Sequence, residues 1–241
     1  EKGKYQFEGR FNQGIVSINL PQIAILADGD EQKFWNILDE RLELCYEALM
    51  CRHYSLVGIE SDISPMHWQH GAISKLEKGE RIDSLLYGGY SILTLGYIGI
   101  AEMVKLIKGK ALSTEEGHQF ALKVIKHLKE TSLKWEKETN IEFVICGMIS
   151  ERLGKRFAQK DKEKFGTIKD INDKGKYTSA YCLNKKENIG LYEKLQLESD
   201  FEKTSLGGVI SYINIKKLND TELENIIKYI YENIQLSEFE N

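Results

Sequence analysis

Short apolar runs, each followed by a longer amphipathic stretch, set the pattern of this chain. Three runs have the length and the β-branched or apolar content of buried strands, and each leads into a helical pattern. They are residues 14–20 (GIVSINL), 88–96 (GGYSILTLG) and 141–146 (IEFVIC). Strands that alternate with helices favour parallel pairing through right-handed crossovers. The sequence therefore predicts the α/β fold class.

Spacing and capping residues place the helices. Over residues 30–57 apolar side chains recur at helical spacing, and Asp30 suits the N-cap position. Pro21 is expected to end the first strand in a turn. Ser113 and Glu116 form a capping-box signature that predicts another long helix. Further helices are expected over residues 98–108, 150–160 and 219–233, and a further strand over 209–215.

Charge and hydropathy exclude some partners. The chain has 33 Lys and Arg against 37 Asp and Glu, a formal net charge of -4 and a pI near 5.9. This balance gives no basic footprint for nucleic acid. The longest apolar runs are shorter than the roughly 20 residues of a membrane span, and no signal-peptide pattern occurs. We therefore expect a cytoplasmic protein that binds neither nucleic acid nor membranes.

Cysteine spacing and linker content bear on the organisation of the chain. The cysteines show no paired short spacing, so neither a zinc site nor a disulfide framework is predicted, and a reducing cytoplasm fits. No Pro-, Gly- or Ser-rich linker interrupts residues 1–241, which are expected to form one domain or a piece of one. The cysteines are Cys45, Cys51, Cys146 and Cys182.

The turn after the third strand is the strongest candidate for a binding site. In α/β folds ligands bind at the carboxyl ends of the strands, where amides at helix N-termini favour anions. A glycine at this turn lets backbone amides approach a phosphate closely. An ordinary strand-to-helix connection capped by Ser150 is the alternative. The candidate phosphate-binding residues are Gly147, Met148, Ile149, Ser150 and Glu151.

Other candidates carry less weight. The glycine pair at 207–208 either brings backbone close to a ligand or only turns the chain. The polar loop at residues 9–14 suits an amide side chain that points into a cavity. His67 and His70 form a close pair, but surface or core histidines are the better interpretation because no further metal ligands can be placed. A thiol hydrolase that uses Cys146 with one of these histidines is a less favoured alternative.

Specific strings add a resemblance to these patterns. GRFNQGIVSINLPQIA, LDERLELCYEAL, WQHGA, LLYGGYSILTLGYIGIAE and TSLGGVISY occur in this order. They make the chain resemble the anaerobic (class III, glycyl-radical) ribonucleoside-triphosphate reductases from Gly9 to about Gln235. The string over residues 85–102 is the most distinctive part.

The resemblance implies a fold and a reaction. The fold is a ten-stranded α/β barrel of the glycyl-radical enzyme type, with parallel strands joined by helices. The reaction is the reduction of ribonucleoside triphosphates to deoxyribonucleoside triphosphates, with electrons from formate or a thiol system. A glycyl radical, installed by an S-adenosylmethionine-dependent iron–sulfur activase, generates the thiyl radical of a cysteine. A structural zinc and a homodimer are also implied.

The resemblance also assigns residues. Asn12 matches an asparagine that hydrogen-bonds the substrate ribose, and residues 146–151 match a phosphate loop. Met148 and Ile149 depart from the small hydroxyl and proline positions of that loop. Cys182 stands where relatives tend to have a histidine, at the end of the segment 176–182.

The same resemblance implies that the radical-bearing residues lie outside this chain. The thiyl cysteine is expected before Gly9, and the glycyl-radical motif and the zinc site after Gln235. None of the four cysteines matches the thiyl position, so no catalytic residue is assigned. We expect a partial catalytic barrel that lacks the N-terminal allosteric region, and we expect this barrel to be inactive alone. A non-catalytic nucleotide-binding or scaffold module derived from the same barrel is the alternative.

Overall fold

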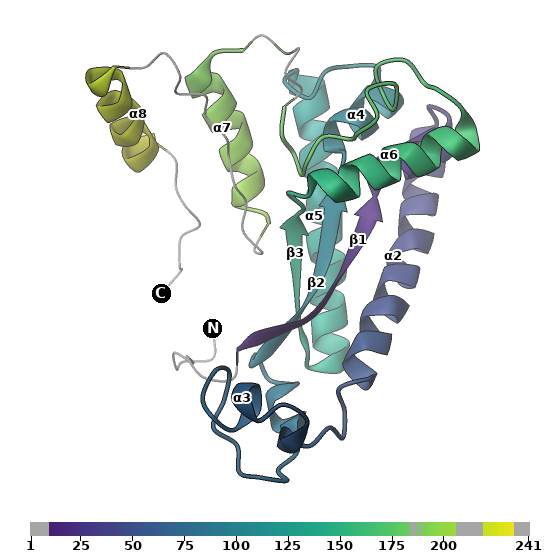
Figure 1. Ribbon diagram of the computed structural model, residues 1–241. Helices are drawn as coiled ribbons and strands as arrows, with labels where there is room; N and C mark the ends of the chain where they lie inside the picture. Colours follow the sequence, from purple (N-terminus) through teal and green to yellow (C-terminus); the bar gives the residue numbers. More distant parts are fainter. Residues whose placement is uncertain (1–9, 184–186, 188, 206–218, 234–241) are drawn as a thin grey trace.

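Three parallel strands lie side by side at the centre of the fold (Figure 1). The computed structural model describes residues 10–183, 187, 189–205 and 219–233 of the chain. The strands are β1 (Phe11–Asn19), β2 (Ser91–Ile98) and β3 (Glu142–Gly147), in the order β1-β2-β3 and with both pairs parallel. The predicted α/β class is confirmed.

Helices cover one face of this sheet. Helix α2 (Glu31–Tyr54) contacts β1 and α5 (Glu115–Thr139) contacts β3, while α1 (Leu20–Ala27) and α4 (Ile100–Lys108) pack on each other. Burial of each larger aliphatic side chain in the shared core contributes about 1.5–3 kcal/mol. The strands contribute Ile18, Leu93, Leu95, Tyr97, Phe143 and Ile145 to this core.

The opposite face of the sheet, which we term the second face, carries the intervening residues. Side chains alternate along a strand, so residues between the core positions point away from the helices. Gly96 leaves room there: a Cβ at this position would lie 2.7 Å from Ser17 Oγ and 2.6 Å from Met148 Cγ. The second face is formed by Asn12, Ile15, Ser17, Ile92, Thr94, Gly96, Val144 and Cys146.

The remaining elements lie around the two ends of the strands. At the start of β1, a small lobe brings the ring of Trp68 edge-on to Phe11, with ring centroids 5.1 Å apart. Helix α6 runs across the carboxyl ends of the strands (Figure 1). The bounds of these elements are η1 Ser61–Ile63, α3 Pro65–Trp68, η2 Ile82–Leu85, α6 Glu151–Phe165, α7 Leu191–Glu202 and α8 Asp220–Asn233.

The predicted helices over 30–57, 98–108, 150–160 and 219–233 are confirmed as α2, α4, α6 and α8. The turn predicted at Pro21 is wrong. Pro21 instead occupies the first turn of α1, where the missing N–H of proline costs no helical hydrogen bond, and Asn19 caps the helix.

Two further details differ from the sequence-based expectation. Helix α5 is capped by Thr114 and not by Ser113, because Thr114 Oγ1 accepts a hydrogen bond from the amide of Gly117 at 3.2 Å. The polar loop expected at residues 9–14 becomes strand from Phe11 onward. Its polar residues pair with β2 and are therefore part of the sheet.

The strand expected at 209–215 and the glycine pair at 207–208 lie outside the described residues. All four cysteines are free thiols. Within the part of the chain that the structure describes, no helix is long and apolar enough to cross a membrane.

Candidate functional site

The turn at Gly147 lies at the carboxyl end of β3, and close packing explains its glycine. A Cβ at residue 147 would lie 2.7 Å from the Ala180 Cβ and 3.1 Å from the Tyr97 hydroxyl oxygen. The amide of Met148 donates to the carbonyl of Tyr97 at 2.9 Å. This amide is therefore used within the sheet, and the amides of the following helical turn are the ones available to a ligand.

The N-terminus of α6 follows this turn directly. Ser150 is the N-cap, and its side chain accepts a hydrogen bond from the Leu153 amide at 3.2 Å. The first amides of a helix have no acceptor inside it and favour anions. A cavity of about 480 Å³ opens here, lined by Ser150, Arg152, Leu153 and Arg156.

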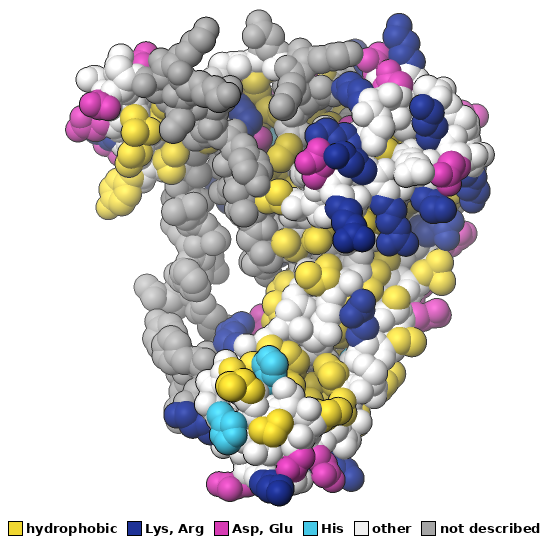
Figure 2. Space-filling model, in the orientation of Figure 1, with side chains coloured by type: hydrophobic (Ala, Val, Ile, Leu, Met, Phe, Trp, Pro, Cys, Tyr) yellow, Lys and Arg dark blue, Asp and Glu magenta, His cyan; other side chains and the backbone are white. Residues whose placement is uncertain are grey.

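Two arginines give this cavity its charge. Arg152 and Arg156 are exposed, and neither has an ion-pair or hydrogen-bond partner among the described residues. They stand four positions apart and so on one side of the helix. Figure 2 shows Lys and Arg side chains gathered over α6. The arrangement suits a polyanionic group such as a phosphate.

Glu151 is engaged differently from its neighbours. Its Oε1 lies 3.0 Å from Lys176 Nζ and 3.3 Å from Lys155 Nζ, and hydrogen bonds from these lysines lower the pKa of the Glu151 carboxyl. The side chain of Glu151 is thus a stably charged anion that links α6 to residue 176. Of the predicted phosphate contacts, Glu151 has only its backbone amide to offer.

The segment 176–182 lies directly against the Gly147 turn. The amide of Ala180 donates to the carbonyl of Met148 at 3.1 Å, and that of Tyr177 donates to the carbonyl of Gly154 at 3.3 Å. The amide of Gly99 donates to the carbonyl of Thr178 at 3.1 Å. The structure therefore brings together the two segments to which the family resemblance drew attention, 146–151 and 176–182.

Cys182 ends this segment in a half-buried position. Burial raises the pKa of its thiol to about 11, so the sulfur stays protonated at neutral pH. A protonated thiol offers a weak donor where a histidine would offer a stronger one.

Asn12 lies at the opposite end of the strands, on the second face. Its Nδ2 donates to Thr94 Oγ1 at 2.7 Å, and its Oδ1 accepts from the amide of Gly14 at 2.9 Å. Asn12 is exposed, so its amide retains one N–H and one lone pair for a ligand.

The predicted ribose and phosphate contacts do not meet at one point. Asn12 is opposite Ile92 in the sheet, and Gly147 is opposite Tyr97. Five residue steps along β2 correspond to about 16 Å at the usual rise of a parallel strand. A ligand that reaches both must lie extended along the strands.

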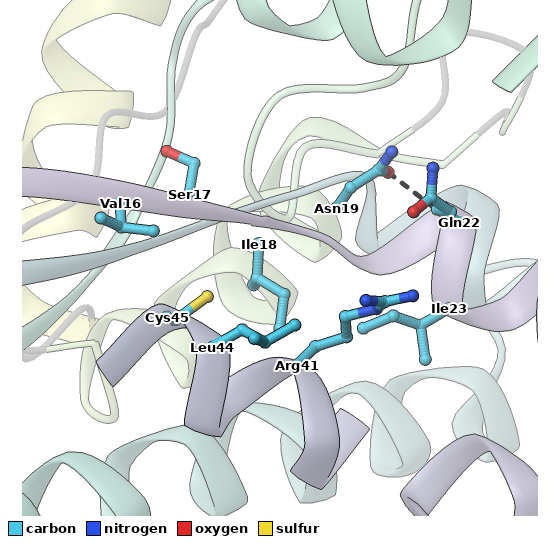
Figure 3. A pocket seen from close by; sticks show the side chains of 9 residues that line it. All are labelled: Val16, Ser17, Ile18, Asn19, Gln22, Ile23, Arg41, Leu44 and Cys45. Atoms are coloured by element: carbon cyan, nitrogen blue, oxygen red, sulfur yellow. Dashed lines mark hydrogen bonds between the residues drawn. The ribbon is translucent and has the colours of Figure 1, made fainter. Parts of the chain in front are cut away.

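A second cavity, of about 210 Å³, lies between β1 and α2 (Figure 3). Its lining includes Arg41, which extends toward Ile23, and Asn19, whose Oδ1 accepts from the Gln22 amide. The buried Nε of Arg41 has no hydrogen-bond partner among the described residues. Sequence reasoning predicted no site here.

The histidine and cysteine candidates do not converge. Cys146 is near the carboxyl end of β3, and burial raises the pKa of its thiol. His67 belongs to the lobe at the other end of the sheet, where Ser64 Oγ lies 2.6 Å from its Nδ1. His70 is exposed in the same lobe. The structure does not assemble the thiol hydrolase site.

Sequence reasoning missed the arginines of α6 and the residues that hold Asn12. The arginines had a usable signal, since Arg152 and Arg156 fall at a four-residue spacing just after the expected N-cap. Thr94 had no such signal, because its partner Asn12 is 82 positions away in sequence.

Comparisons with known proteins agree on one family. The family model described as anaerobic ribonucleoside-triphosphate reductase matches residues 1–240. A reductase of that name from Enterobacteria phage T4 is 36% identical over 223 residues, which are 90% of this chain and 35% of the relative. The reductase of Haemophilus influenzae is 34% identical over 239 residues, which are 97% of this chain and 34% of the relative.

Solved structures with the same fold come from Thermotoga maritima. The anaerobic ribonucleotide reductase in complex with dATP and CTP matches with a TM-score of 0.72 and 21% identity, over 92% of this chain and 35% of that one. The structure with glycerol in the active site matches with a TM-score of 0.73 and 21% identity, over 98% of this chain and 39% of that one. This chain thus spans about a third of the length of the curated relatives it matches.

Proposed function

This chain belongs to the anaerobic ribonucleoside-triphosphate reductase family, and we propose that it carries part of the substrate site of an enzyme that reduces ribonucleoside triphosphates to deoxyribonucleoside triphosphates. The observation that carries the proposal is the arginine-lined N-terminus of α6 at the carboxyl end of the sheet. A cationic cavity beside free helix amides is chemically matched to a triphosphate.

The phosphate part of the site is assigned to the turn and to α6. Gly147 lets the turn pack closely against Ala180 and Tyr97, Met148 and Ile149 complete the turn, and Ser150 caps the helix. Arg152 and Arg156 then offset part of the negative charge of the triphosphate.

The ribose part of the site is assigned to Asn12. Its remaining N–H and lone pair match the donor and acceptor of a ribose hydroxyl. Thr94 holds the amide in place through the 2.7 Å hydrogen bond. An extended nucleotide lying along the second face would connect this residue with α6.

The complete fold is proposed to be a ten-stranded α/β barrel in which the three strands take part. Among the described residues β1 and β3 each pair on one side only, so both are available to further strands. We assign residues 1–241 to a single partial barrel. A closed barrel shields reactive intermediates from water.

The radical chemistry is proposed for the whole protein. A glycyl radical, installed by a separate S-adenosylmethionine-dependent iron–sulfur activase, supplies the hydrogen-abstracting power through a cysteine thiyl. No catalytic residue is assigned within this chain, and a homodimer and a structural zinc complete the proposal. No group of three or more His, Cys, Asp or Glu that could hold a metal ion occurs among the described residues.

Calorimetric titration with CTP, tripolyphosphate and cytidine tests the substrate site. CTP is chosen because a Thermotoga maritima relative is described in complex with it. We expect an Arg152→Ala/Arg156→Ala variant to weaken binding of CTP and tripolyphosphate, and Asn12→Ala to weaken CTP and cytidine only. Lys160→Ala, which removes an exposed charge further along α6, is the control and should leave the binding of all three ligands unchanged. Absence of CTP binding to the wild-type protein would overturn the proposal.

A non-catalytic nucleotide-binding module is the second candidate. The commitment of the Met148 amide to the sheet favours it, because one phosphate donor is lost. Reduction of CTP by the full-length protein with its activase decides between the two: dCTP formation supports the enzyme, and tight binding without turnover supports the module.

A further inference from the structure

A β-bulge at the start of β1 decides which way Asn12 points. Asn12 is opposite Ile92 and Gly14 is opposite Leu93, so Gln13 is an extra residue in β1. Leu93 faces the helices, and Ile92 belongs to the second face. A strand without the bulge would place residue 12 on the same side as residue 14, toward the helices, because one inserted residue switches the face.

The side chain of Gln13 is anchored on the helix side. It is buried, and its Nε2 donates to the carbonyl of Leu86 at 3.1 Å and to Ser91 Oγ at 2.8 Å. A backbone carbonyl can only accept, so the orientation of the amide is fixed. Its Oε1 therefore faces His53 Nδ1, 2.9 Å away.

His53 completes the anchor from helix α2. The side chain is 1% exposed, and burial lowers the pKa of its imidazole, which keeps the ring neutral at pH 7. Because Gln13 Oε1 can only accept, Nδ1 carries the proton and donates. Nε2 then accepts from the hydroxyl of Tyr87 at 3.0 Å. The network has one consistent direction, from Tyr87 through His53 to Gln13.

We propose that His53, acting through Gln13, is a positioning residue that holds the bulge and thereby keeps Asn12 on the second face for the substrate. A bulge locally disrupts the ladder of backbone hydrogen bonds, and the side-chain hydrogen bonds of Gln13 select the residue at which this bulge forms. The consequence for Asn12 is the pair of contacts with Thr94 and Gly14 described above. The role in substrate binding rests on the proposed function of Asn12.

The test compares His53 variants by NMR and by ligand binding. His53→Phe keeps a flat ring but removes both hydrogen bonds. We expect it to shift the NMR signals of the Asn12 side-chain amide and of the Gly14 backbone amide. We also expect it to weaken CTP binding about tenfold, the effect of losing one hydrogen bond between Asn12 and the ribose. Tripolyphosphate binding should not change, since α6 lies at the other end of the strands. Glu47→Ala, at an exposed position of the same helix α2, is the control.

Two polar variants separate positioning from general packing. His53→Asn places an amide N–H where Nδ1 stood and should restore the Asn12 signals. His53→Gln extends its amide toward Tyr87 and should not. Should His53→Phe fail to fold, this pair still decides. Equal Asn12 signals in the Asn and Gln variants, or unchanged signals in a folded Phe variant, would overturn the inference. Failure of the wild type to bind CTP overturns the proposed function, while the Asn12 signals still decide the positioning role.

Discussion

The buried carboxylate of Glu102 accepts hydrogen bonds from both the amide and the hydroxyl of Thr178, at 3.1 and 2.6 Å. Glu102 lies in the first turn of α4, and Thr178 lies in the segment that rests on the Gly147 turn. The position of one wall of the candidate phosphate site is therefore fixed by a carboxylate that has been removed from water.

Glu102→Gln is predicted to reduce the pH dependence of stability. Burial raises the pKa of Glu102 above its ordinary value of 4.5. As pH rises, Glu102 therefore loses its proton at a lower pH in the unfolded chain than in the folded protein. Its contribution to stability is complete below pH 4.5 and is lost as pH rises through the folded-state pKa. The melting temperature of the variant relative to wild type should rise between pH 4.5 and pH 8. A difference that is constant with pH would contradict the prediction.

Asp161→Ala is predicted to destabilise the fold by about 3 kcal/mol, because buried donors lose their acceptor. Asp161 is fully buried, and its Oδ2 accepts from Asn19 Nδ2 at 2.9 Å and from the Tyr177 hydroxyl at 2.8 Å. These bonds join α6 to the end of β1 and to the 176–182 segment. Urea denaturation measures the loss. Asp161→Asn retains one acceptor oxygen and should lose less; equal losses would argue that side-chain volume alone matters.

The sequence predicted those parts of the fold that depend on local spacing. The stripe that includes Phe34, Leu38 and Leu42 marks α2 because its apolar residues recur at helical distance, and all three are buried. Helix α1 was missed because Pro21 was interpreted as a stop, although Asn19 supplied an N-cap signal.

The candidate site divides in the same way. Its glycine turn and Ser150 cap are local and were predicted. The bulge at Gln13 could not be predicted, since it depends on His53, 40 positions away, and on Ser91, 78 positions away. The contact between Glu102 and Thr178 joins residues 76 positions apart and leaves no local pattern either.

Gly147→Ala is predicted to displace the 176–182 segment and to weaken CTP binding. The new methyl group would lie 2.7 Å from the Ala180 Cβ, which is closer than packed side chains allow. Overpacking of this kind typically costs about 1–3 kcal/mol, measurable by thermal unfolding. Ala180→Gly in the same chain removes the opposing methyl group, and residue 180 has a φ of 47°, which glycine adopts readily. The double variant should recover part of the loss; no recovery would point to the Tyr97 hydroxyl as the obstacle.

Arg152→Ala and Arg156→Ala are each predicted to weaken CTP binding about tenfold at low salt, since a charge-assisted hydrogen bond to phosphate is lost. Because both guanidinium groups are exposed, salt screens their attraction to phosphate, so the affinity of the wild type for CTP should fall as ionic strength rises. The affinity of the Arg152→Ala/Arg156→Ala double variant should respond less. Arg→Lys at either position keeps the charge but loses the bidentate geometry, so we expect affinity between that of wild type and the alanine variant. Calorimetric titrations at two salt concentrations measure these effects. If the Arg152→Ala/Arg156→Ala variant showed the same salt response as the wild type, neither arginine would belong to the phosphate site.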